Sequence, residues 1–252
     1  MFNYLKLIAT YLLILPASAY AQTQDVAAML QDADNYRLQQ DAALVASQVS
    51  LYKDGELDST REYHVYLREN HESLVVFKSK AEAGQKMLML GDNYWMLMPK
   101  SRRPIRITPM QKLLGEASVG DISTLTWSDD YQGKWLRTAS VNNGKHHYQT
   151  NMLELSSATK GASYHRIELW LEQGSNFPVK ANLYLRSGKL AKEAWYIKGE
   201  RDNKTAVVSM MLIDKIQPAK QTEIKYLAVE PMRLEDKFYN PAYLSRNKNG
   251  DL

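Results

Sequence analysis

Residues 87–131 read MLMLGDNYWMLMPKSRRPIRITPMQKLLGEASVGDISTLTWSDDY, and this stretch says most about the fold. It predicts two short methionine-rich strands that meet at Gly91-Asp92-Asn93, followed by a basic loop punctuated by prolines. A short amphipathic helix is expected over residues 108–114, and a Gly-Asp step then leads into a final aromatic strand. Methionine side chains are flexible and polarizable, so the stretch predicts adaptable apolar surface beside a cationic rim. Such a surface is typical of ligand binding rather than catalysis.

The segment before this stretch changes from a helical to a strand-like period. Apolar residues recur at spacings of three and four over residues 23–40, which predicts a helix capped by Thr23 or Asp25. After Asp41 the period becomes two, and Lys53-Asp54-Gly55-Glu56 predicts a hairpin turn because it supplies residues that adopt positive φ. Further strands are expected over residues 63–67 and 74–78.

Short polar turns divide the second half of the chain. They occur at residues 143–144, 160–161, 174–175, 187–188 and 202–203, and strands are expected over residues 164–171, 181–186, 190–198 and 207–216. Regularly spaced strands, with helix mainly at one end and one insertion in the middle, favour a large antiparallel sheet. We therefore expect a mainly β (α+β) fold in which a single curved antiparallel sheet curls around its helices.

The first 21 residues have the pattern of a secretory signal peptide. One cation, Lys6, precedes an apolar core that ends at Pro16, and Ala19-Tyr20-Ala21 supplies the small residues that signal peptidase requires. We expect cleavage after Ala21, which leaves residues 22–252 as one domain without a Pro/Gly/Ser-rich linker. Because the sequence has no cysteine, neither disulfides nor a lipid on a cleavage-site cysteine can form. The expected compartment is the periplasm.

Charge and composition exclude some classes of function. The sequence has 32 basic and 28 acidic residues, and the cations are scattered along the strands rather than massed on one helix or groove. This distribution does not predict nucleic-acid binding. We expect a monomer.

The sequence contains no recognisable catalytic or metal-binding motif. None of its histidines lies in a metal-ligand pattern, and the adjacent pair His146-His147 would point to opposite faces of a strand. The run from Gly115 to Gly120 lacks the lysine of a phosphate-binding loop, and no nucleophile motif follows a strand. The paired carboxylates Asp129-Asp130 and Glu235-Asp236 are expected to cap turns. We therefore expect no enzyme activity, no cofactor and no metal.

The central stretch offers two surfaces. Trp95 and Leu97 share one strand face, whereas Tyr94, Met96 and Met98 share the other, and ordinary core packing is the default for either face. Five of the eleven methionines lie between Met87 and Met110, which favours a deformable ligand wall. The candidate ligand-binding residues are Met87, Met89, Trp95, Leu97, Ile107, Leu113 and Leu114. The basic loop is either a solvated surface or a contact with lipid phosphate or an acidic membrane partner, through Lys100, Arg102, Arg103 and Arg106.

Several motifs, in order, resemble a known family. The segments are YWMLMPKSRRPIRI from Tyr94, LLGEASVGDI from Leu113 and FYNPAYL from Phe238, with RIELWL from Arg166 and FPVK from Phe177 between them. They resemble the LolA-like outer membrane lipoprotein-sorting proteins over essentially the whole mature chain. The resemblance implies an incomplete β-barrel with helices covering its concave face and a hollow for a lipid or lipoprotein acyl chains.

Two functions follow from the resemblance together with the residues. The first is a periplasmic carrier that binds a lipid or lipoprotein acyl chains in an apolar hollow and delivers them toward the outer membrane. Its partners would include an inner-membrane transporter or an outer-membrane acceptor. The alternative is a regulatory or protein-interaction module of the RseB-like type, which would have a filled core and an apolar outer patch.

Overall fold

The computed structural model describes residues 25–38, 42–69, 72–101, 103–108, 121, 126–246 and 252. Its helical elements are short: α1 (Val26–Asn35), η1 (Lys80–Glu82), α3 (Trp127–Asp130), η3 (Asp236–Tyr239) and α4 (Pro241–Arg246). Its strands are β1 (Ala43–Lys53), β2 (Glu56–Arg68), β3 (Glu72–Phe77), β4 (Lys86–Leu90), β5 (Asn93–Leu97), β6 (Ile105–Ile107), β7 (Tyr131–Asn142), β8 (His147–Ser157), β9 (Arg166–Glu172), β10 (Pro178–Tyr184), β11 (Leu190–Arg201), β12 (Lys204–Asp214) and β13 (Lys220–Pro231).

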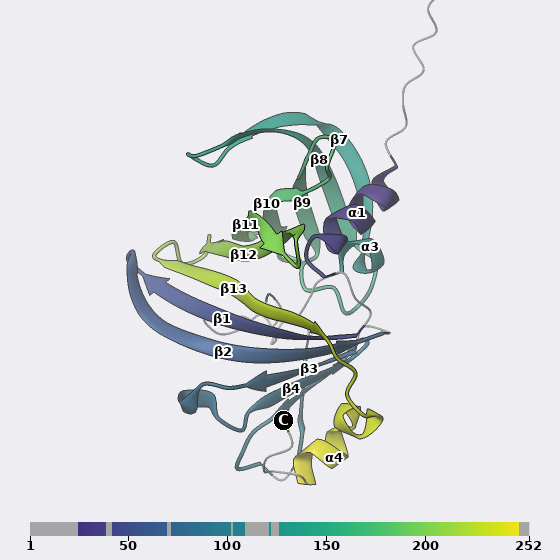
Figure 1. Ribbon diagram of the computed structural model, residues 1–252, viewed down its shortest axis with the longest axis vertical. Coiled ribbons are helices and arrows are strands. Elements are labelled where there is room, and N and C mark those ends of the chain that lie inside the picture. The colour runs from purple at the N-terminus through teal and green to yellow at the C-terminus, as the bar shows by residue number, and fades with distance from the viewer. Residues whose placement is uncertain are drawn as a thin grey trace, which may run out of the picture.

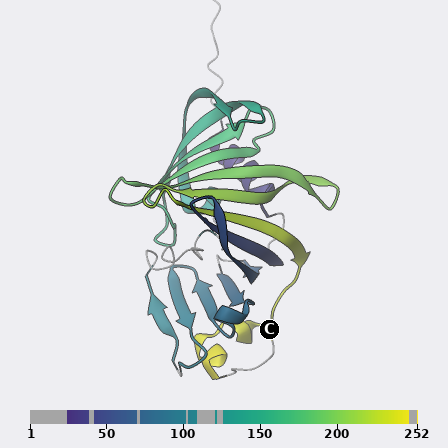
Figure 2. The same ribbon diagram turned by 90° about the vertical axis from the view of Figure 1, so that its left-hand side faces the viewer.

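All thirteen strands belong to one antiparallel sheet that does not close on itself. The strand order is β6-β5-β4-β3-β2-β1-β13-β12-β11-β10-β9-β8-β7, so β6 and β7 form its two edges. The pairing of β1 with β13 joins two arms, the first made of β2–β6 and the second of β7–β12. The second arm arches over α1, and α4 lies against the first arm (Figures 1 and 2). The predicted mainly β fold with an open, curved sheet is confirmed.

Local sequence explains the predicted hairpins. Asp54 and Gly55 both adopt positive φ, at 52° and 84°, and their turn pairs Lys53 with Glu56, as the sequence predicts. The helix α1 begins after Asp25, whose side chain accepts a hydrogen bond from the Ala28 amide at 3.1 Å. The helix is shorter than predicted, since its last residue is Asn35.

The sheet has an inner face and an outer face. The inner face carries the main core cluster, which includes alternate residues of β2, Tyr63, Val65 and Leu67, together with Met29 and Leu30 of α1. The outer face of the first arm carries a second cluster that η3 and α4 cover. The predicted common face of residues 63–67 is therefore confirmed, and α1 packs against the inner face as expected.

A glycine allows α1 to approach the sheet closely. A Cβ atom on Gly133 of β7 would lie 2.5 Å from Cγ1 of Val26 and 3.1 Å from Cδ1 of Leu30, which is closer than such atoms pack. Glycine at this position therefore fixes the depth at which the helix sits in the second arm.

One prediction for the central stretch is wrong. The aromatic segment before Tyr131 was expected to be strand, but residues Trp127–Asp130 form the helix α3, and the strand β7 starts at Tyr131. Asp34 of α1 provides the reason, because its carboxylate accepts hydrogen bonds from the amides of Trp127 at 3.0 Å and Ser128 at 2.8 Å. Residues 109–114 of the predicted helix, and the signal peptide, lie outside the described residues.

Candidate functional site

The methionine-rich strands β4 and β5 divide their side chains between the two faces of the sheet. Their register pairs Met87 with Met96, Leu88 with Trp95 and Met89 with Tyr94. Met87, Met89 and Tyr94 belong to the inner cluster, and Met96 packs against it. On the outer face, Leu88 and Leu97 belong to the second cluster, and Trp95 packs against that cluster. The predicted separation of Trp95 and Leu97 from Tyr94 and Met96 is confirmed. The prediction is wrong for Met98, because β5 ends at Leu97 and the Met98 side chain is exposed.

This register separates the candidate ligand-binding residues into two sets. Met87, Met89 and Ile107 lie on the inner side, whereas Trp95 and Leu97 lie on the outer side beneath α4, so the structure does not bring all of them to one wall. Leu113 and Leu114 lie outside the described residues. The sequence pattern identified each strand face, but it did not show that both faces would be covered.

The inner wall is apolar and rich in methionine. Four buried methionines, Met29, Met87, Met89 and Met210, belong to the inner cluster, and they come from α1, β4 and β12. Because thioether side chains repack at low cost, this wall can change shape more readily than one made of branched residues. It is also well filled, since Leu153, Leu155, Ile167 and Leu169 are all fully buried.

A hydrogen bond joins the two arms of the sheet at this wall. The Tyr94 hydroxyl donates to the carbonyl oxygen of Gly161, in the loop between β8 and β9, at 3.0 Å. A Cβ atom on Gly161 would lie 2.9 Å from that hydroxyl and 3.0 Å from Oδ1 of Asp92, so the loop can approach only because it has no side chain there. Burial raises the pKa of the Tyr94 hydroxyl, and the nearby carboxylates of Asp92 and Asp130 raise it further. The hydroxyl therefore remains a neutral donor at physiological pH.

Two carboxylates, those of Asp121 and Asp34, bind groups that are distant along the chain. Asp121, which lies between β6 and α3 in the sequence, is buried; it accepts a 2.6 Å hydrogen bond from the Tyr164 hydroxyl and pairs with the Lys192 ammonium. Asp34 caps α3, and burial raises its pKa against the opposing effects of Arg37 and the α3 amides. The Arg37 guanidinium also lies 4.6 Å from the centre of the Trp127 ring. Sequence analysis missed these groups because their partners are distant along the chain.

The basic loop is exposed beside the edge of the first arm. Lys100, Arg103 and Arg106 are exposed, and Arg102 lies outside the described residues. The Arg106 side chain donates to Oδ1 of Asn93, and its guanidinium lies 5.9 Å from the centre of the Trp95 ring. Arg106 is therefore anchored on the outer face, and its charge remains close to solvent.

The described residues contain no cluster of three His, Cys, Asp or Glu side chains that could hold a metal ion. Among the helices in the described part of the chain, none has the length and apolarity that crossing a bilayer demands.

Together these features define a mainly β protein built on one open, curved antiparallel sheet. A family model described as "Uncharacterized protein" matches residues 69–246, and the chain belongs to that family. Its fold is that of the LolA superfamily, the lipoprotein-sorting proteins. No curated protein matches the chain.

Three solved structures show the same fold. A LolA superfamily protein from Nitrosomonas europaea is 26% identical, with a TM-score of 0.76 over 86% of this chain and 97% of that one. A domain assigned to the outer membrane lipoprotein-sorting proteins, from Vibrio parahaemolyticus, is 20% identical, with a TM-score of 0.68 over 87% and 98%. A DUF1329 family protein from Desulfovibrio piger is 19% identical, with a TM-score of 0.69 over 87% and 96%.

Proposed function

We propose that this protein is a periplasmic carrier that binds a lipid, or the acyl chains of a lipoprotein, on the inner face of its open sheet. It would deliver this cargo toward the outer membrane without a cofactor or turnover. The observation that carries the proposal is the methionine-rich inner wall of β4 and β5, close to the open edge of a LolA-type sheet. The lipoprotein-sorting assignment of the Vibrio parahaemolyticus domain supports the same function.

The inner wall must rearrange to admit an acyl chain. In the described residues its apolar side chains already pack against one another and against α1, so a ligand has to displace part of this packing. Met87, Met89 and Met96 are suited to such movement because they are unbranched and lie within the three strands nearest the open edge. We therefore assign the acyl chain to these methionines and Ile107, with Leu113 and Leu114 completing the site.

The basic loop supports delivery to a membrane or an acidic partner. Lys100, Arg103 and Arg106 are exposed beside the same edge of the sheet, where arginine suits phosphate oxygens. We propose that this loop, with Arg102, meets an anionic surface when cargo is transferred.

Residues 1–21 would direct export, so N-terminal sequencing of the mature protein should start at Gln22, and an intact Met1 would contradict export by a cleaved signal peptide.

Native mass spectrometry of protein extracted from its own periplasm provides the main test. The carrier should retain lipid adducts, and purified protein should bind a long-chain fluorescent fatty acid with a shift in tryptophan emission. Met96→Glu places a charge on the half-buried inner wall and should abolish fatty-acid binding while the protein remains folded. Met211→Glu provides the matched control because Met211 pairs with Trp195 on the opposite face.

A protein-interaction module is the second candidate, and the filled inner cluster favours it. The described inner face has fully buried leucines and isoleucine beneath α1, as a closed core would have. A protein-interaction module would carry no lipid adducts and would not bind the fatty acid. Replacing Met96 with glutamate would unfold it rather than abolish binding selectively. The two candidates therefore give opposite results in the same experiment.

A further inference from the structure

The outer face of the second arm carries an apolar cluster that is built entirely from strands. Its buried members, here called the edge cluster, are Val141, Met152, Trp170 and Val179, one from each of β7, β8, β9 and β10. The hydrophobic residues packed against them also lie in strands, and no helix in the described part of the chain contributes to the cluster. Because Val141 belongs to β7, the edge cluster extends to the open edge of the sheet.

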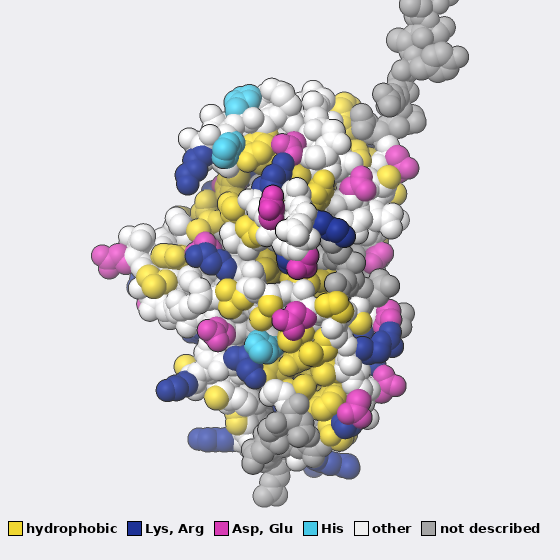
Figure 3. All heavy atoms as spheres, viewed as in Figure 1, with side chains coloured by type: hydrophobic (Ala, Val, Ile, Leu, Met, Phe, Trp, Pro, Cys, Tyr) yellow, Lys and Arg dark blue, Asp and Glu magenta, His cyan; other side chains and the backbone are white. Residues whose placement is uncertain are grey.

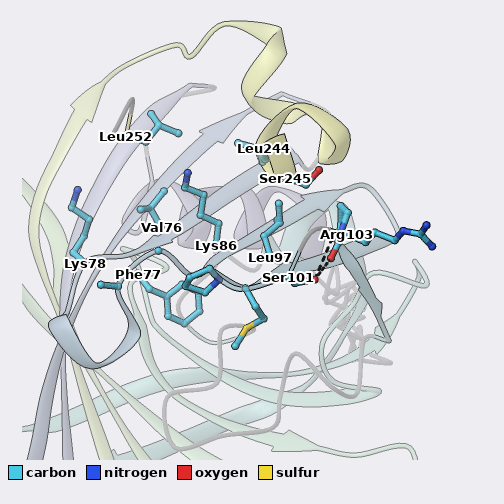
Figure 4. Close-up of a pocket in the computed structure, with 15 residues that line it drawn as sticks. Val76, Phe77, Lys78, Lys86, Leu97, Ser101, Arg103, Leu244, Ser245 and Leu252 are labelled. Atoms are coloured by element: carbon cyan, nitrogen blue, oxygen red, sulfur yellow. Dashed lines mark hydrogen bonds between the residues drawn. The ribbon is translucent and has the colours of Figure 1, made fainter. Parts of the chain in front are cut away.

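The outer face of the first arm differs, because the chain itself covers it. Leu244 of α4 and Leu252 line one pocket together with Val76 and Leu97 of the strands (Figure 4). All four side chains belong to the second cluster or pack against it. The described residues provide no comparable cover for the second arm, so the edge at β7 is the more open of the two surfaces.

β7 is a long edge strand, and among the described residues it pairs only with β8. It spans Tyr131–Asn142, and after a bulge between Trp135 and Arg137 its register with β8 continues without interruption to its end. The helix α1 approaches its first part at Gly133, whereas the far end of the β7–β8 hairpin arches away from α1 (Figure 1). Unpaired backbone groups along such an edge are a template for a further strand.

One hydrogen bond shows which backbone groups of β7 face the open edge. The Thr150 hydroxyl of β8 donates to the carbonyl oxygen of its register partner Ala139 at 2.7 Å, so the Ala139 carbonyl points toward β8. In an antiparallel ladder, alternate residues of a strand direct their amide and carbonyl groups to opposite edges. The backbone groups of Thr138 and Ser140 therefore face the open edge, and both side chains are exposed.

The β7–β8 hairpin is basic. Residues 131–153 contain no aspartate or glutamate, and their cations are Lys134, Arg137 and Lys145. Lys134 lies opposite Glu154 in the register. Arg137 and Lys145 are exposed, and within the described part of the chain neither forms an ion pair. Lysine or arginine and histidine side chains gather at the surface where Figure 1 places the far end of this hairpin (Figure 3).

Arg137 lies on the outer face, beside the edge cluster. Its register partner is Met152, which belongs to that cluster, and Leu136 and Ala139 of β7 pack against it. The outer side of the edge therefore presents apolar groups next to an exposed cation. This arrangement complements a strand whose side chains on one face are apolar at one end and acidic at the other.

We propose that β7 binds an extended acidic segment of another protein, which joins the sheet as a further strand. The backbone groups of Thr138 and Ser140 bond to this segment, its apolar side chains pack against Ala139 and Val141, and a carboxylate contacts Arg137. In this mode of recognition, main-chain hydrogen bonds provide affinity and alternate side chains provide specificity. A second copy of the chain is a poorer partner, because its β7 carries the same cations. The site lies on the other arm from the methionine-rich wall and does not depend on the carrier function proposed above.

Calorimetry and amide-exchange NMR with a model peptide test this site. The probe is an acetylated and amidated peptide, TVTVTETET, whose valines and glutamates fall on one face of a strand. We expect it to bind, whereas the charge-reversed peptide TVTVTKTKT should not. Bound peptide should slow the exchange of the Thr138 and Ser140 amides with solvent and leave that of the Ala139 amide, which faces β8, unchanged.

Two substitutions test the backbone and the charge separately. Ser140→Pro removes an amide that faces the open edge and should abolish peptide binding, whereas Ser140→Ala retains this amide and should bind as before. Arg137→Gln should weaken binding about threefold, as expected for the loss of one exposed ion pair. Arg186→Gln, at an exposed position between β10 and β11, is the matched control and should leave the affinity unchanged. Circular dichroism and the unfolding midpoint establish that each variant is folded; where Ser140→Pro is not, amide exchange in the unmodified protein decides.

Several results would overturn the proposal. Absence of binding by the acidic peptide, or equal binding of the lysine peptide, would mean that the edge does not recognise an acidic strand. Binding that leaves the exchange of the Thr138 and Ser140 amides unchanged would exclude strand addition. Slowing of these amides in the protein alone, increasing with its concentration, would assign the edge to a second copy of the chain. Fatty-acid binding, measured on the same samples, reports on the carrier function independently.

Discussion

The Tyr94 hydroxyl donates a 3.0 Å hydrogen bond to the Gly161 carbonyl oxygen, and this bond joins the two arms of the open sheet. Tyr94 belongs to β5 of the first arm, and Gly161 lies in the loop between β8 and β9 of the second. Because loss of such a hydrogen bond costs only about 1 kcal/mol, the contact would open at modest cost in the carrier proposed above.

Tyr94→Phe should weaken this contact without emptying the core. Loss of one hydrogen bond costs about 1 kcal/mol of unfolding free energy, because the phenyl ring keeps its packing. We also expect faster release of bound fatty acid, measured by stopped-flow fluorescence. Tyr148→Phe on β8 is the control and should change neither quantity. Release at the original rate from Tyr94→Phe would mean that the contact does not restrict entry.

Gly133→Ala should displace α1 from the second arm. The new methyl group would overlap Cγ1 of Val26, and overpacking of this kind costs about 1–3 kcal/mol. Val26→Ala in the same chain should recover part of the lost stability, so a double-mutant cycle by urea unfolding gives a favourable coupling between the two positions. Gln132→Ala, on the neighbouring exposed residue, should change stability by less than about 0.5 kcal/mol. Purely additive effects would contradict the close contact of α1 with β7.

Glu168 should make the fold less stable in acid. Burial acts to raise its pKa, but hydrogen bonds from Asn182, Arg166 and Tyr184 together outweigh burial and lower the pKa below its ordinary value of 4.5. Because the pKa of Glu168 is lower in the folded state, its charged carboxylate stabilises the protein fully at pH values above the unfolded-state pKa. This stabilisation is lost as the pH falls through the folded-state pKa.

Comparison with Glu168→Gln measures that effect. The unmodified protein should have the higher unfolding midpoint at pH 7, and its advantage should shrink as the pH falls below about 4.5. Glu200→Gln, at an exposed position on β11, is the control. A difference in unfolding midpoint between the two proteins that stays constant with pH would mean that the hydrogen bonds from Arg166, Asn182 and Tyr184 do not favour the charged carboxylate.

Charge reversal in the basic loop should reduce binding to anionic vesicles. Lys100→Glu combined with Arg106→Glu replaces two exposed cations, and co-sedimentation with vesicles that contain phosphatidylglycerol at low salt should fall several-fold. Stability should change little, since both side chains are exposed. The paired reversal of Lys145 and Lys189, in turns of the second arm, is the control. Equal vesicle binding by all three proteins would remove the proposed role of the loop.

Much of the fold could be predicted from the sequence because it follows from local rules. The positive-φ residues of the turns and the alternation along β1 and β2 depend on neighbours in the chain. The helix α3 could not be predicted in this way, because its capping carboxylate belongs to Asp34 of α1. The candidate site was only partly predictable for a similar reason. Trp95 and Leu97 are apolar because α4, far along the chain, covers the outer face.

The place of β13 in the middle of the sheet has a consequence for how the chain folds. Its partner β1 is made first and β13 last, so the pairing of Val45 with Val229 must wait for almost the whole polypeptide. Each arm consists of neighbouring hairpins that can form from local contacts, whereas the pairing of β1 with β13 requires the slow closure of a very long loop. A polypeptide truncated before β13 should therefore contain two preformed arms without a junction, and the last strand to emerge is the one that unites them.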